Sequence, residues 1–311
     1  MSMRSHFFGG LVPRTLIREN AAMPRLRILL LLLFPLLAAR PGLAADEEFL
    51  LAFPPPPDHR FWMEFNSGLE NSRSVYGELD LLFGDEQHLL LGAGQSDLED
   101  VDRRVNLYSY TLGFNSAYGA PFEIGGLYEF WGNTDVLWTH SFSLPLRWST
   151  RDWSFDLRPG YTAISLYLQP PLRPRRQIDT SSEFLEGRII YCGLPRWRLS
   201  LGGSRYAYAQ DLSRLQQPRA RSLFSDVTLV LGYGFPRSRM TVEATRHFSR
   251  WQLGAAFERT IAEVDGSRVD IASLKGAFDL NVQFSLHTRI GRIESSAPSY
   301  NYLQLAGELR F

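Results

Sequence analysis

The chain has 311 residues, of which 44% are hydrophobic, and its mean hydropathy is −0.17. Its formal net charge is zero, with 33 basic and 33 acidic residues, so it carries no charge signature of nucleic-acid binding. Beyond the amino-terminal region no apolar run approaches the roughly 20 residues that a membrane helix needs, which excludes a helical membrane protein.

The amino-terminal region has the pattern of a secretion signal. Two arginines precede a Leu-rich apolar core at residues 28–39, and small residues at 42–45 offer a cleavage site. An uncleaved anchor helix is the alternative, but the core is short and ends abruptly. Met23 is the more natural initiator. Residues 1–45 are therefore predicted to be an over-extended start plus a cleaved signal peptide.

A short proline-rich segment follows the signal. Residues 46–58 are first acidic, then apolar, and then contain four consecutive prolines at 54–57. Such a run favours polyproline II and cannot pair in a sheet. We interpret this segment as a periplasmic lead-in to a domain that covers residues 59–311.

Cysteine usage agrees with export. Cys192 is the one cysteine of the chain, so an intramolecular disulfide is excluded. No cysteine lies at the predicted cleavage site, which argues against a lipoprotein. No CxxCH motif and no Cys/His cluster occurs, so the sequence predicts neither a haem cofactor nor a metal site. An acidic cluster at Asp97, Glu99, Asp100 and Asp102 is interpreted as a solvated loop.

From residue 59 onward the sequence consists of strand-like runs with turn residues between them. Fifteen runs are predicted, and no segment of a dozen residues shows a helical period with caps. Their ranges are 61–67, 74–83, 88–95, 105–115, 121–131, 136–148, 153–168, 183–192, 197–208, 225–235, 240–248, 251–261, 269–280, 282–293 and 300–311.

Within these runs apolar and polar residues alternate with period two, as in strands that have one apolar face. Strands of about 10–12 residues exceed the usual length and suit a tilted crossing of a bilayer. Aromatic residues collect near the strand ends, and tight connections alternate with long ones, as in membrane barrels. These features favour an all-β, transmembrane antiparallel β-barrel over a soluble sandwich.

The number of strands is left open between three values. A single-chain barrel with both termini on one side needs an even number, whereas fifteen runs are predicted. Fourteen is preferred, with one weak early run not counted as a membrane strand. Sixteen would follow if the run at 153–168 hides a turn near Pro159 and Gly160, and twelve is the other alternative.

The last strand carries a resemblance to a known class. Residues 302–311 place Leu303, Leu305, Leu309 and Phe311 on one face, and the chain ends on this aromatic residue. This strand resembles the closing strand of Gram-negative outer-membrane β-barrels of the porin type. The resemblance implies that Leu309 and Phe311 form an assembly signal for the barrel assembly machinery. The final strands also resemble, in general character, the small YaiO-like barrels.

The polar face of the predicted strands carries charges of both signs. We expect these residues to line the barrel interior: Glu78, Asp80, Glu123, Glu129, Arg147, Asp156, Arg158, Glu186, Arg188, Arg198, Glu243, Glu258, Lys275, Asp279, His287, Arg289, Glu308 and Arg310. A ring of one sign would predict strong ion selectivity. Mixed signs fit either a water-filled pore or a constricted barrel.

Three functions fit such a barrel in the bacterial outer membrane. A passive or substrate-selective channel for small polar solutes is preferred. A structural or partner-binding barrel with a periplasmic partner is the second, and a lipid-modifying enzyme is the third. His140 and Ser141 are adjacent but are expected on opposite faces, so no catalytic residue is assigned. Outer-membrane lipid and lipopolysaccharide are expected partners. The long-loop arginines (Arg173, Arg175, Arg176, Arg214, Arg219, Arg221) could bind its phosphates but are interpreted as solvated.

Overall fold

The computed structural model describes residues 59–67, 73–83, 87–100, 103–117, 121–133, 136–168, 176–210, 212, 235–294 and 299–311. The predicted signal peptide and lead-in lie outside these residues. Among the described residues no helix is long and apolar enough to cross a membrane. The secondary structure consists of β-strands that pair with their sequence neighbours.

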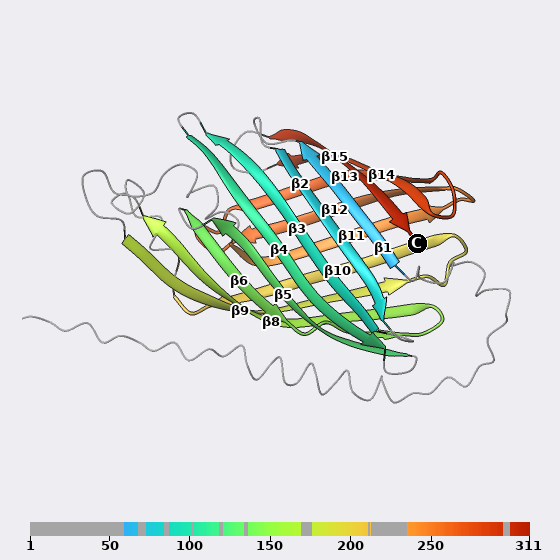
Figure 1. Cartoon of the computed structure of the whole chain (residues 1–311), viewed down its shortest axis with the longest axis horizontal. Helices are drawn as coiled ribbons and strands as arrows, with labels where there is room; N and C mark the ends of the chain where they lie inside the picture. The colour runs from blue at the N-terminus through green and yellow to red at the C-terminus, as the bar shows by residue number, and fades with distance from the viewer. Residues whose placement is uncertain are drawn as a thin grey trace, which may run out of the picture. The chain divides into compact units, whose positions relative to one another are not determined.

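The strands form one closed antiparallel sheet (Figure 1). Their bounds are β1 His59–Ser67, β2 Arg73–Phe83, β3 Gln87–Asp100, β4 Arg103–Ala117, β5 Phe122–Asn133, β6 Leu137–Ser143, β7 Leu146–Ser149, β8 Trp153–Leu168, β9 Arg176–Tyr191, β10 Trp197–Tyr208, β11 Pro236–His247, β12 Trp251–Ala262, β13 Arg268–Asp279, β14 Phe284–Glu294 and β15 Tyr300–Arg310.

The barrel closes between its first and last strands. Residues of β1 pair with residues of β15 over the whole length of β1, from Arg60 opposite Arg310 to Ser67 opposite Leu303. The backbone nitrogen of Phe311 donates a hydrogen bond to the His59 oxygen at 3.0 Å. Figure 1 shows β1 in blue beside β15 in red, with the carboxy-terminus next to the start of β1. No edge strand therefore remains.

The predicted number of fourteen strands is confirmed, because β6 and β7 are two parts of one strand. Both pair with β5 on one side and with β8 on the other. The interruption is at Leu144 and Pro145, since proline has no N–H for the ladder. Pairing continues around it: Leu144 N donates to Pro159 O at 3.0 Å, and Gly125 N donates to Pro145 O at 2.8 Å.

Two sequence expectations about the strands are wrong, and a third falls almost entirely outside the described residues. A turn near Pro159 and Gly160 is wrong, because β8 is continuous and pairs with β9 from Trp153 to Leu168. The predicted run at 225–235 falls outside the described residues except for Phe235, which precedes β11 and is not in a strand. The other fourteen predicted runs correspond to the fourteen strands of the barrel. The expectation that a weak early run lies outside the barrel is therefore wrong, because the early runs correspond to β1 to β5.

Candidate functional site

The outer face of the barrel is an apolar belt. Large hydrophobic side chains are 40–60% exposed there, as for Leu201, Leu253 and Leu305. On β12 the belt runs from Trp251 to Phe257, and Arg259 follows. Six residues at the strand rise and tilt of membrane barrels cover about 15 Å of height. Arg259 and Asp270 both point outward and form an ion pair at 2.9 Å just beyond the belt. This pair marks the boundary between the apolar belt and a polar layer.

The inner face is recognised from contacts that pass over an intervening strand. Side chains converge on the concave side of a curved sheet, so residues two strands apart meet when the strand between them carries a small residue. Tyr76 of β2 donates to Thr111 of β4 at 3.2 Å across Gly92 of β3. Trp62 of β1 packs on His287 of β14 with ring centroids 4.8 Å apart, across β15.

All the charged residues expected on the polar face share this inner side. Directly opposite residues of antiparallel strands point to the same side. The pairs Trp62–Glu78 and Trp62–Glu308 place both glutamates on the side of Trp62. The same reasoning around the sheet places Asp80, Glu123, Glu129, Arg147, Asp156, Arg158, Glu186, Arg188, Arg198, Glu243, Glu258, Lys275, Asp279, His287, Arg289 and Arg310 there.

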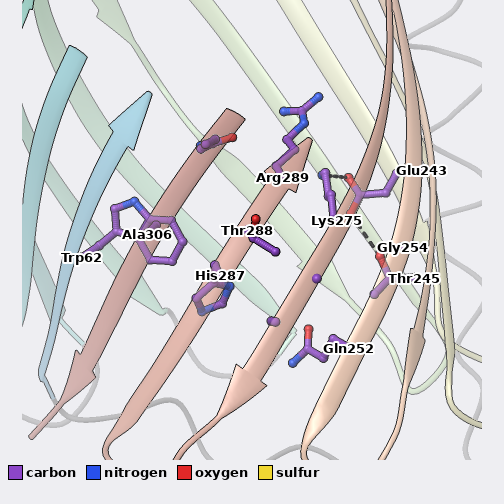
Figure 2. Close-up of a pocket in the computed structure, with 13 residues that line it drawn as sticks. Trp62, Glu243, Thr245, Gln252, Gly254, Lys275, His287, Thr288, Arg289 and Ala306 are labelled. Carbon is purple, nitrogen blue, oxygen red and sulfur yellow. Dashed lines mark hydrogen bonds and ion pairs between the residues drawn. The ribbon is translucent and has the colours of Figure 1, made fainter. Parts of the chain in front are cut away.

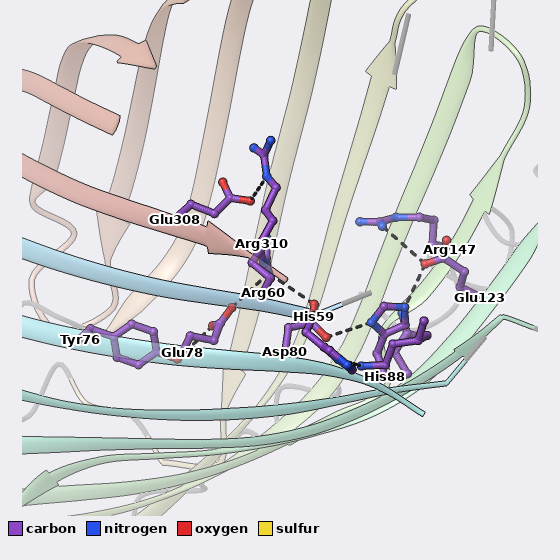
Figure 3. Close-up of polar contacts among 12 residues, drawn as sticks. His59, Arg60, Tyr76, Glu78, Asp80, His88, Glu123, Arg147, Glu308 and Arg310 are labelled. Atoms are coloured by element: carbon purple, nitrogen blue, oxygen red, sulfur yellow. Dashed lines mark hydrogen bonds and ion pairs between the residues drawn. The ribbon is translucent and has the colours of Figure 1, made fainter. Parts of the chain in front are cut away.

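A first ionic cluster joins β1, β2 and β3 (Figure 3). The Arg60 guanidinium lies 3.3 Å from Glu78 and 3.6 Å from Asp80. His88 Nδ1 lies 2.9 Å from the other oxygen of Asp80. Neither Arg60 nor His88 was among the residues expected on the polar face. Arg60 precedes the first clear alternation of the sequence, which is why it was missed.

Arg147 of β7 links carboxylates on both neighbouring strands. It lies 2.7 Å from Asp156 of β8 and 3.5 Å from Glu123 of β5. Half of the Arg147 side chain is exposed. The pair is therefore a hydrated one, whose contribution to stability is at most about 1 kcal/mol.

Arg158 of β8 links a carboxylate on neighbouring β9 with one on β5, two strands away. It lies 3.3 Å from Glu129 and 2.6 Å from Glu186. Its guanidinium carbon is 5.7 Å from the centre of the Phe184 ring. Tyr206 donates to Glu186 at 2.9 Å, so this carboxylate has both an ionic and a neutral partner.

Glu243 of β11 is the centre of a further ionic cluster (Figure 2). Its Oε2 lies 2.7 Å from Lys275 Nζ of β13 and 3.4 Å from Arg188 of β9, each two strands away from β11. The strands between carry Gly254 opposite Lys275 and Gly202 opposite Arg188. Small residues at these positions leave room for both cations to reach one carboxylate.

A pocket of about 300 Å³ lies on the inner face of β11 to β15 and β1. Its polar lining includes Glu243, Lys275 and Arg289, with Trp62 and His287 on its other side. His287 Nε2 lies 2.8 Å from Ser285 Oγ and 3.2 Å from Glu308 Oε2. Figure 2 shows these side chains along one face of the tilted strands.

Other charged residues on the inner face differ in their partners. Glu258 pairs with Arg239 at 3.1 Å, a base that was not predicted. Arg310 lies 2.9 Å from Glu308 and 3.9 Å from Asp279. Arg198 makes no ion pair among the described residues.

An apolar cluster occupies the inner side near the ends of the strands that adjoin the longer loops. Its core consists of Leu107, Leu137, Ile164, Leu166, Leu212, Phe235 and Val264, with Trp131, Ile178 and Tyr208 packed against it. This cluster was not predicted. A signal exists in residues 163–168, where β8 carries no charged residue on either face.

The two residues considered for catalysis are not brought together. His140 lies on the outer face, where its Nδ1 is 2.7 Å from the Tyr128 hydroxyl oxygen. Ser141 is on the inner side and shares a 2.9 Å hydrogen bond with Thr162. Within the described residues no group of three His, Cys, Asp or Glu side chains has metal-binding geometry. The side chains of the loop arginines, and those of Glu99, Asp100 and Asp102, lie outside the described residues.

No protein-family model matches the sequence, and no curated protein matches it significantly. Solved structures match in fold. The CymD monoaromatic hydrocarbon channel is 8% identical, with a TM-score of 0.54 over 81% of this chain and 88% of CymD. A Pseudomonas aeruginosa FadL homologue is 10% identical, with a TM-score of 0.50 over 81% and 89%. The NanC porin is 7% identical, with a TM-score of 0.44 over 81% and 100%. The chain thus has a closed 14-strand β-barrel, and it shares this barrel fold with the CymD channel and the FadL homologue.

Proposed function

We propose that this protein is a passive channel of the bacterial outer membrane for small polar solutes. The observation that carries the proposal is the division of the two barrel faces. The outer face is an apolar belt, and the inner face holds charged side chains of both signs. A belt of this size needs a lipid environment. Charged side chains enclosed by the sheet need water, since isolated charges are costly to bury.

The inner charges are arranged as hydrated pairs, which supports an aqueous interior. Side chains in the pairs of Arg147 and Arg158 are 25–49% exposed. Neither sign dominates the inner face, so we expect weak ion selectivity in the channel as a whole. The solute is expected to be small and polar, because it must pass these side chains.

Planar bilayer recording of the refolded barrel tests the proposal. The expected result is stepwise conductance, together with faster gel migration of the unheated protein than of the boiled protein. A barrel that shows the gel shift but gives no conductance step at any voltage contradicts a channel. Recovery of the protein in the soluble periplasm, with migration unaffected by boiling, would contradict the membrane barrel itself.

A structural or partner-binding barrel is the second candidate, and the apolar cluster around Leu137 favours it. Leu137, Leu166 and Leu212 are almost fully buried and fill the interior on one side. A permanent constriction would leave a barrel that anchors a periplasmic partner and conducts nothing. Co-purification from cross-linked cells, with a silent bilayer, would favour this function over the channel.

A further inference from the structure

Arg289 differs from the other charges that line the 300 Å³ pocket, because it has no acidic partner. Lys275 and Glu243 neutralise each other at 2.7 Å, and Arg188 adds a second cation to Glu243. Among the described residues Arg289 forms no ion pair. Its contacts are Ser273, whose Oγ accepts from Nε at 3.0 Å, and the Tyr302 ring, whose centre is 5.6 Å away.

These contacts hold the guanidinium in place and leave its end free. The hydrogen bond to Ser273 uses Nε, and the Tyr302 ring supports the guanidinium. Neither terminal nitrogen has a hydrogen-bond partner within the described part of the chain. In Figure 2 the side chain of Arg289 extends from β14 on the same face as Lys275. Two adjacent N–H groups of a guanidinium match the two oxygens of a carboxylate.

The remaining pocket lining suits the body of a small organic acid. Trp62 offers an aromatic surface, and its orientation is set by the edge-on contact with His287 at 4.8 Å. Ala277 and Ala306 are small and leave space beside it, while Gln252 and Gln304 provide neutral polar groups. A volume of about 300 Å³ is at the lower end for ligand sites, which fits a single ring better than an oligomer.

We propose that this pocket binds small organic carboxylates with a flat, largely apolar body. The carboxylate pairs with the terminal nitrogens of Arg289, and the body packs against Trp62. The proposal rests on the proposed channel function and gives it a substrate class: the site is a stopping point along the path of a small organic acid. The net positive charge left by Arg289 raises the local concentration of anions.

Isothermal titration of the folded, detergent-solubilised barrel with sodium benzoate at low ionic strength tests the site. Benzamide is the neutral counterpart of the same shape. We expect benzoate to bind, benzamide to bind much more weakly, and Arg289→Gln to weaken benzoate binding by about tenfold or more. Arg292→Gln is the matched control, because Arg292 lies three residues further along β14, on the outer face, and its side chain is 61% exposed.

The outcomes separate this site from the channel. The site is overturned if the wild-type barrel does not bind benzoate, or if it binds benzoate and benzamide equally. It is also overturned if Arg289→Gln binds benzoate as well as the wild type does. A gel shift on boiling confirms that each variant is folded, and Arg289→Lys should retain part of the affinity because it keeps the charge. Benzoate binding by a barrel that gives no conductance overturns the channel and leaves the site intact.

Discussion

Lys275 Nζ lies 2.7 Å from Glu243 Oε2, although the two residues belong to strands separated by a third. The lysine side chain crosses β12 beside Gly254, where a Cβ atom would approach Thr245 Oγ1 to 2.8 Å. The pair therefore spans β12 next to a position that carries no side chain. The Glu243 carboxylate thus lies between two cations, Lys275 and Arg188, on the inner face of the barrel.

Glu243→Gln is expected to shift the ion selectivity of the channel towards anions. The substitution keeps the shape of the side chain but leaves the charges of Lys275 and Arg188 uncompensated. The effect on stability should stay below about 1 kcal/mol, because the partners are partly exposed. The measurement is the reversal potential across a KCl gradient.

The matched control for that shift is Glu294→Gln, which removes a carboxylate from the outer face, where Arg292 is its partner at 3.2 Å. Its reversal potential should equal that of the wild type. If Glu243→Gln conducts with an unchanged reversal potential, Glu243 does not face the conducting path.

Gly132→Ala is expected to destabilise the barrel strongly. The φ angle of Gly132 is 131°, which side-chain-bearing residues rarely adopt, and an added Cβ would collide with the Leu137 carbonyl oxygen. The expected loss is at least about 2 kcal/mol. Urea titration of the folded fraction on unheated gels measures it.

Gly126→Ala is the control for that loss, because Gly126 lies in the same strand and a Cβ there meets nothing within 4 Å. Its urea midpoint should stay close to that of the wild type. Equal midpoints for the two variants would show that the backbone at Gly132 relaxes without cost.

Phe311→Ala is expected to reduce assembly in cells more than stability after refolding. The Phe311 side chain is 54% exposed and, among the described residues, makes one ring contact, with His59 at 5.5 Å, so its truncation removes little packing. If the terminal aromatic residue is an assembly signal, the amount of protein in the outer membrane should fall several-fold.

Leu305→Ala serves as the comparison for assembly, because Leu305 is 50% exposed on the same strand face but is not terminal. Quantitative blotting of outer-membrane fractions gives the amounts, and urea titration of refolded protein gives the stabilities. Equal outer-membrane amounts for Phe311→Ala and Leu305→Ala would remove the signal from Phe311.

Cys192 is expected to react slowly with alkylating agents at neutral pH. It lies in the turn after β9, and burial raises the pKa of its thiol above the ordinary value. Because the thiolate is the reactive form, a raised pKa lowers the rate at a given pH. The same shift makes the fold lose stability as the pH rises through the ordinary thiol range, since the unfolded chain ionises first.

Iodoacetamide rates measured from about pH 7 to about pH 10 check the thiol, with the urea-unfolded chain as reference. The rate of the folded protein should rise at higher pH than that of the unfolded chain, and Cys192→Ser gives the background. Superimposable pH profiles for the folded and unfolded chains would contradict the effect of burial.

The fold was largely predictable because a barrel strand repeats a pattern that needs no long-range information. Period two in β14 and β15 already separates the apolar belt from the charged face. The bounds of β9 were harder. Its first residues, from Arg176 to Ser182, are mostly polar and pair with β8 beyond the belt, so no apolar alternation marks them.

The inner face was predictable as a set, whereas the pairs within it were not. Alternation places Arg289 and Glu243 on one side, but only the register between strands decides that Glu243 meets Lys275 and that Arg289 meets no acid. The apolar cluster around Leu137 was missed for a similar reason. It is assembled from strands and loops far apart in the sequence, and inward leucines look locally like any core residue.

The seam between β1 and β15 determines when this molecule can exist as a barrel. His59 and Phe311, which the closed sheet brings together, lie at opposite ends of the described chain. A chain in which β1 and β15 have not yet met carries two unpaired strand edges. Since Arg60 pairs with Arg310, this seam joins the strands that are farthest apart in the described sequence, which makes it the pairing with the largest loop-closure cost.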